Sequence, residues 1–189
     1  MATIVLYHHV LGLTPGVRAL ADALATAGRT VLTPDLFDGR TFASIDEGMA
    51  FVRSQDQDHL AEIGIAAALE VAEPLVVAGI SYGAMVAGMV ASRRPVAGML
   101  SLESFVDPSW VGGWSRPVPM QIHAMEQDPF FLEDEEAARA WVAEHDDAEL
   151  CTYPGDQHLF TDANTPAHAA GLTAIVIQRS LAFVEQVSG

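Results

Sequence analysis

The chain has 189 residues, half of them apolar and 18% charged, and its formal net charge is −16. All nine positive residues are arginines, so lysine-dependent chemistry is excluded: no Walker-type phosphate lysine, no Schiff-base lysine and no Ser–Lys dyad can form. So acidic a surface repels a phosphate backbone, and we expect no nucleic-acid partner.

Nothing in the sequence indicates export or a membrane. The apolar start at Ala2–Leu6 is short and has no basic stretch before it, and no apolar run reaches the ~20 residues of a membrane span. The single cysteine, Cys151, cannot form an internal disulfide. We therefore expect a cytoplasmic protein with no membrane partner. Monomer and dimer both stay open.

Short apolar runs alternate with helical patterns along the whole chain. The predicted strands are Ala2–Tyr7, Thr30–Thr33, Leu75–Ala78, Val96–Leu102, Val118–His123 and Ala148–Tyr153. The predicted helices are Val17–Ala27, Ser44–Arg53, His59–Val71, Tyr82–Arg93, Glu133–His145 and Ala167–Val187. Consecutive apolar residues within strands are typical of a sheet buried on both faces. The succession predicts one α/β domain over residues 1–189, with a mostly parallel sheet and helices on both faces.

A G-x-S-x-G motif lies between a predicted strand and a predicted helix. Gly79-Ile80-Ser81-Tyr82-Gly83 directly follows the strand at Leu75–Ala78, which is the context of a nucleophile elbow. The two glycines allow a sharp turn that presents the Ser81 hydroxyl near the positive end of the helix dipole. The alternative is a serine that only caps the helix.

A serine nucleophile needs a base and an acid that orients the base. In the order Ser, acid, His, each partner follows a later strand. Asp128 lies just beyond the strand that ends at His123, and His158 lies just beyond the strand that ends at Tyr153. Glu126 and Asp156 are alternative acids, but Asp156 is so close to His158 that it suits the local turn better.

Backbone N–H groups are needed to bind the oxyanion that develops during acyl transfer. We expect one from Tyr82 and the second from Val10, with Leu11 as the alternative, because this loop follows the first strand. His8 and His9 are neighbours on an extended chain and point to opposite sides, so they predict no metal site. His9 is expected to border the pocket instead.

These residues together resemble the dienelactone hydrolase family of α/β-hydrolases. The likeness includes the segments Val10–Pro15, Val31–Phe37 and Tyr153–Asp162, besides the motif around Ser81 and the Asp128 loop. The resemblance implies an α/β-hydrolase fold in which Ser81, Asp128 and His158 are nucleophile, acid and base, and Val10 and Tyr82 form the oxyanion hole. The namesake enzymes have cysteine at the position of Ser81 and glutamate at that of His9.

The sequence thus predicts a cofactor-free serine hydrolase acting on a small-molecule ester or lactone. His9, Leu11 and Arg53 are candidate pocket residues, and Arg53 is on spacing alone the candidate to hold a dienelactone-type carboxylate. The segment from Asp35 to Asp58 is a candidate lid. Two alternatives remain: a thioesterase or acyltransferase that uses the same three residues, and a non-catalytic binding relative.

Overall fold

The computed structural model describes residues 2–189 and contains one six-stranded, fully parallel sheet in the order β2-β1-β3-β4-β5-β6. The strands are β1 (Thr3–Tyr7), β2 (Thr30–Leu32), β3 (Leu75–Ile80), β4 (Gly98–Leu102), β5 (Met120–Met125) and β6 (Ala148–Tyr153). The helices are α1 (Pro15–Leu24), α2 (Ile45–Ser54), α3 (Gln57–Leu69), α4 (Tyr82–Arg93), α5 (Glu135–Glu144) and α6 (Ala170–Val187). The predicted α/β class with a parallel sheet is confirmed.

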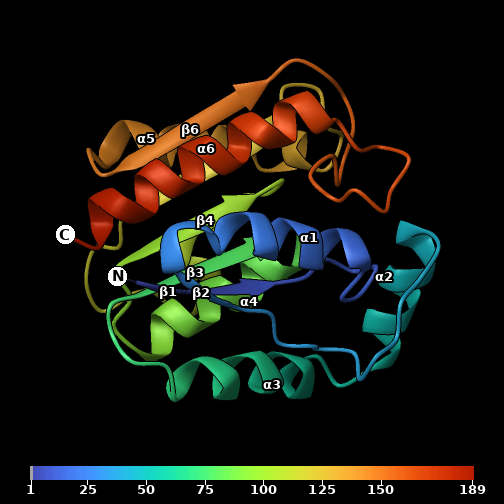
Figure 1. Ribbon diagram of the computed structural model, residues 1–189, viewed down its shortest axis with the longest axis horizontal. Coiled ribbons are helices and arrows are strands. Elements are labelled where there is room, and N and C mark those ends of the chain that lie inside the picture. The colour runs from blue at the N-terminus through green and yellow to red at the C-terminus, as the bar shows by residue number, and fades with distance from the viewer. Residues whose placement is uncertain (1) are drawn as a thin grey trace.

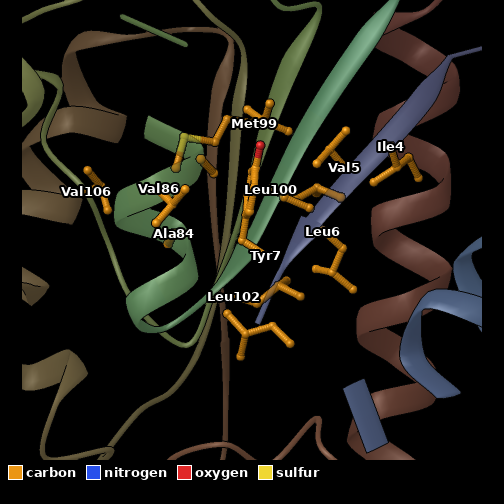
Figure 2. Packing of buried hydrophobic residues seen from close by; sticks show 14 of the residues in the cluster. Ile4, Val5, Leu6, Tyr7, Ala84, Val86, Met99, Leu100, Leu102 and Val106 are labelled. Carbon is orange, nitrogen blue, oxygen red and sulfur yellow. The ribbon is translucent and has the colours of Figure 1, made fainter. Parts of the chain in front are cut away.

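Helices cover both faces of the sheet, which is why its central strands are apolar on consecutive residues. Every residue of β3, β4 and β5 is buried. Helices α1 and α6 lie beside each other on one face, and α3 and α4 lie on the other (Figure 1). Figure 2 shows Ile4 and Leu6 of β1 on the α1 and α6 side, with Ala84 and Val86 of α4 across the sheet. Helices on both faces thus leave the sheet's ends as the place for a site.

Local signals explain several helix boundaries. The Ser44 hydroxyl accepts the Glu47 N–H at 3.3 Å, and the Glu47 carboxylate accepts the Ala43 N–H at 3.1 Å, one residue before the expected partner. Helix α6 begins at Ala170 rather than Ala167, because the Ala169 N–H donates to the Phe160 carbonyl and holds the preceding segment in a turn. Strand β3 extends past Ala78 to Ile80, since Gly79 and Ile80 still pair with β4.

The sheet has one functionally important end. All strands run in the same direction, so the loops that follow them gather at their carboxyl ends, the usual place for a site in such a fold. Helix α2 lies at the end toward which the strand arrows point in Figure 1. No helix within residues 2–189 is both long and apolar enough to span a membrane.

Candidate active site

Ser81 lies in a strained turn between β3 and α4. Its φ of 51° and ψ of −114° place a non-glycine residue in a region that side chains rarely adopt. A Cβ on Gly79 would lie 2.2 Å from the Gly83 backbone, and one on Gly83 would lie 2.3 Å from the Tyr7 carbonyl oxygen. Both glycines are therefore needed for the close approach of backbone segments that holds the turn. The Ser81 N–H donates to the Leu102 carbonyl at 2.8 Å, which fixes the turn to β4.

His158 joins Ser81 to Asp128 through two short hydrogen bonds. Its Nε2 lies 2.9 Å from the Ser81 Oγ, and its Nδ1 lies 2.7 Å from the Asp128 Oδ2. An ionised carboxylate can only accept, so the proton on the neutral ring belongs on Nδ1 and Nε2 accepts the serine proton. Asp128 is fully buried, and its Oδ1 accepts the Phe130 N–H at 2.9 Å. The Phe130 ring lies 4.4 Å from the imidazole, centroid to centroid.

The alternative acids do not approach the imidazole in this way. Asp156 is exposed, and its carboxylate accepts from the neighbouring Gln157 side chain. Glu126 is also exposed. Of the three acids considered from the sequence, Asp128 is the one that hydrogen-bonds His158.

The loop after β1 contains the two alternative oxyanion donors, Val10 and Leu11, and their N–H groups differ in their hydrogen bonds. The Leu11 N–H donates to the His9 Nδ1 at 3.2 Å and is therefore occupied. Val10 lies on the wall of the same cavity as Ser81, and in residues 2–189 its N–H makes no hydrogen bond to another residue. Tyr82 is the first residue of α4, where N–H groups have no intrahelical acceptor. Of the two candidates in this loop, Val10 is thus the one whose N–H has no partner among residues 2–189.

His9 lies away from the pocket wall, contrary to the expectation from sequence. It is fully buried, and its Nε2 lies 2.8 Å from the Asp162 Oδ2, which also accepts the Thr14 hydroxyl at 2.7 Å. Burial raises the pKa of Asp162, but the hydrogen bonds from His9, the Asn164 N–H and Thr14 outweigh burial and lower that pKa overall. This group links the loop after β1 to the loop after β6, a pairing 153 residues apart in sequence.

Two cavities meet at His158. The larger cavity has a volume of about 430 Å³ and is lined by Ser81, His158, Glu103 and Arg53, among others. Arg53, a candidate pocket residue from the sequence, is thus at the edge of this cavity as an exposed residue. Its remaining lining is mostly apolar: Val10, Ile45, Met49, Val52, Tyr82, Met85, Ser104, Phe105, Val106, Trp110, Phe130, Glu133 and Asp134. The smaller cavity has a volume of about 380 Å³. Ile45 and Phe130 line both cavities, whereas Leu11 lines the smaller one and not the larger. Helix α2, within the candidate lid, supplies part of both walls.

Glu103 is a site residue that sequence reasoning missed. It directly follows β4, has a φ of 60°, and its side chain is fully buried at the wall of the larger cavity. The one available signal was an acidic residue immediately after a strand that is apolar except for Ser101, at the sheet end where Ser81 also lies. Within residues 2–189, no group of three or more His, Cys, Asp or Glu side chains is arranged to hold a metal ion.

Comparisons with known proteins agree with this architecture. The family model described as "Dienelactone hydrolase family" matches residues 1–188. A dienelactone hydrolase-like promiscuous phosphotriesterase from metagenomic libraries is 17% identical, with a TM-score of 0.79 over 100% of this chain and 87% of that one. Dienelactone hydrolase from Anabaena variabilis is 20% identical, with a TM-score of 0.67 over 98% and 86%.

A metagenome-derived lipolytic enzyme is 16% identical, with a TM-score of 0.71 over 98% of this chain and 94% of that chain. At these identities the structural likeness shows the fold. No curated protein matches the chain.

Proposed function

The chain belongs to the dienelactone hydrolase family of ester-acting hydrolases, and we propose that it cleaves carboxylic esters with Ser81 as nucleophile, His158 as base and Asp128 as orienting acid. The observation that carries the proposal is the pair of hydrogen bonds of 2.9 and 2.7 Å that joins the three side chains. Strand-end loops at a single end of the sheet supply all three groups, as in other α/β-hydrolase sites.

The reaction begins when Ser81 Oγ attacks the ester carbonyl carbon and its proton passes to His158 Nε2. The carbonyl oxygen becomes an oxyanion that accepts from the Val10 and Tyr82 N–H groups. Asp128 stabilises the imidazolium through the Nδ1–H bond. The imidazolium then protonates the leaving alcohol oxygen as the C–O bond breaks, which leaves an acyl ester on Ser81. Water attacks this ester with His158 as base, the carboxylic acid departs, and Ser81 regains its proton.

The lone cysteine supports serine rather than thiol chemistry. Cys151 lies buried in β6, where burial above all raises the pKa of its thiol to about 11, so the nucleophilic thiolate is scarce at neutral pH. The apolar lining of the larger cavity suits a small aliphatic or aromatic acyl group, of an open ester or a lactone.

Hydrolysis of p-nitrophenyl butyrate by the Ser81→Ala variant tests the proposal. We expect kcat/KM to fall by about three orders of magnitude or more, with the thermal unfolding curve retained. Ser92→Ala is the matched control, because Ser92 lies on the same helix and its hydroxyl donates to the Met89 carbonyl at 2.7 Å. Equal turnover by wild type and Ser81→Ala would refute the proposal.

Two further measurements separate the alternatives. A fluorophosphonate probe should label wild type at Ser81 and should not label the Ser81→Ala variant, whereas a non-catalytic binding relative would not react. Butyryl ester, lactone and thioester substrates, each with water or an added alcohol as acceptor, distinguish an esterase from a thioesterase or an acyltransferase.

A further inference from the structure

The smaller cavity adjoins the proposed base but not the proposed nucleophile. His158 lines both cavities, whereas Ser81 lines only the larger one. The residues of the two expected oxyanion donors, Val10 and Tyr82, also line the larger cavity and not the smaller. The imidazole is therefore the one group of the three-residue site that both spaces share.

The reaction assigns the two halves of an ester to different places around these groups. The acyl carbon bonds to Ser81 Oγ, so the acyl half lies in the larger cavity, which contains Ser81. The alcohol oxygen receives its proton from His158 Nε2, so it lies within hydrogen-bond distance of the imidazole when the C–O bond breaks. The space that adjoins His158 without adjoining Ser81 is the smaller cavity, and the rest of the alcohol can extend into it.

The walls of the smaller cavity suit an uncharged, mainly apolar group. Within residues 2–189, no Asp, Glu or Arg lines it, although the chain has a net charge of −16. Phe130 is 44% exposed, so its ring offers apolar surface that a bound group can cover. Apolar residues make up much of the lining: Leu11, Phe42, Ile45, Pro129, Phe130 and Pro166.

The size and the construction of this cavity favour a bulky occupant. An apolar cavity of about 150 Å³ holds a benzene molecule, and about 380 Å³ is available here. Two of its walls come from the loop of Leu11 after β1 and the loop of Asn164 after β6. The His9–Asp162 hydrogen bond of 2.8 Å joins these loops, and Asp162 also accepts the Asn164 N–H at 2.6 Å. The walls are thus held in place before a ligand binds, which lowers the cost of binding.

We propose that the smaller cavity binds the alcohol half of the substrate, so that esters of bulky, uncharged arylalkyl alcohols are preferred to esters of small alcohols. The inference rests on the proposed function. The acyl half occupies the larger cavity, next to Ser81. Ile45 and Phe130 line both cavities, so the ester group passes between the two spaces at these residues and His158.

The test compares three esters by the rate at which they release carboxylic acid. Ethyl butyrate and naphthylethyl butyrate differ only in the alcohol, and the two primary alcohols are similar in acidity, so the chemical step is matched. Ethyl hexanoate lengthens the acyl half instead. We expect wild type to favour naphthylethyl butyrate over ethyl butyrate by about tenfold or more in kcat/KM, because the ring system buries apolar surface. A ratio near one in wild type would overturn the proposal.

Two tryptophan substitutions show which cavity holds which half. Asn164 is exposed on the wall of the smaller cavity, and Asn164→Trp keeps the backbone N–H that Asp162 accepts. It should lower the naphthylethyl-to-ethyl ratio about tenfold and leave the hexanoate-to-butyrate ratio as in wild type. Met49→Trp, on the wall of the larger cavity alone, should do the reverse. Glu185→Trp, exposed on α6 and in neither wall, is the control and should keep both ratios.

The opposite pattern would refute the assignment: an alcohol preference that Met49→Trp removes and Asn164→Trp retains. Thermal unfolding checks that each variant folds. Ala167→Trp fills the same cavity from another wall residue if Asn164→Trp does not fold, and the wild-type ratio needs no variant. Failure of the proposed function is seen separately, as no turnover of any of the three esters or as turnover that survives in Ser81→Ala.

Discussion

Lowering the pH from 7 to 5 should destabilise the fold by about 4 kcal/mol through two buried histidines, His8 and His123. Burial above all lowers the pKa of His8 to about 4 and that of His123 to about 3, from 6.5. In both cases the unfolded state binds more protons within this pH range, so stability is lost as the pH falls. Linkage gives about 2 kcal/mol for each histidine between pH 7 and pH 5.

The contacts of His8 explain why its ring resists a second proton. Its Nδ1–H donates to the His9 carbonyl at 2.8 Å, and its Nε2 accepts the Leu36 N–H at 3.0 Å. With a proton on Nε2, the Nε2–H and the Leu36 N–H would both be donors and would point at each other, and His8 is fully buried. The carboxylate of Asp35, 3.8 Å from Nε2, favours the charged ring and offsets this only in part.

Urea unfolding followed by tryptophan fluorescence at pH 7 and pH 5 measures the effect. The variant His8→Asn has nothing to titrate at this position, so its loss between the two pH values should be about 2 kcal/mol smaller than that of wild type, whatever its stability at pH 7. His59→Gln, at an exposed position on α3, should keep the wild-type difference. Equal pH dependence in wild type and His8→Asn would refute the reasoning. Burial raises the pKa of Glu103, so this group adds stability as the pH falls, opposite to the two histidines. Its contribution is common to wild type and the variants, so the test compares how much stability each of them loses.

Two further predictions concern packing and buried hydrogen bonds. Gly83→Ala should lower stability by about 1–3 kcal/mol in thermal unfolding, because its Cβ would lie 2.3 Å from the Tyr7 carbonyl oxygen, whereas Gly171→Ala meets nothing within 4 Å and should not destabilise. Asp162→Asn should cost about 1–3 kcal/mol in urea unfolding, because a carboxylate oxygen that accepts a buried donor is replaced by an N–H. Asp156→Asn, at an exposed position, should stay within about 0.5 kcal/mol, and equal losses in the two asparagine variants would contradict this account.

The fold was predictable because its signals are local. Strand β6 matches its expected limits, Ala148–Tyr153, and α4 matches Tyr82–Arg93. Consecutive apolar residues in β3 indicated a strand buried on both faces, and the glycines around Ser81 indicated the sharp turn after it. Chain order then sufficed to bring the loops of Asp128 and His158 to the same end of the sheet.

The contacts missed from sequence are those made between distant segments. Glu103 belongs to no motif, and its place near Ser81 depends on β4 lying next to β3, which the sequence pattern alone does not specify. His9 looked like a pocket residue because it follows β1, but its ring turns toward Asp162, a partner in the loop after β6. Patterns of apolar residues report which elements form, whereas the partner of a buried polar side chain depends on how the elements are assembled.

Under the proposed function, the hydrogen bond between His9 and Asp162 limits how readily this scaffold could exchange its proposed serine nucleophile for another. The resemblance to the namesake enzymes implies a glutamate at the corresponding position that helps to control a thiol. Here the residue at that position, His9, hydrogen-bonds Asp162 and so links the loop after β1 to the loop after β6, and Thr14 hydrogen-bonds the same carboxylate oxygen. Installing a cysteine at residue 81 would therefore supply sulfur without its regulator. A change from serine to thiol chemistry would therefore also require new residues in place of the hydrogen-bonded group of His9, Thr14 and Asp162.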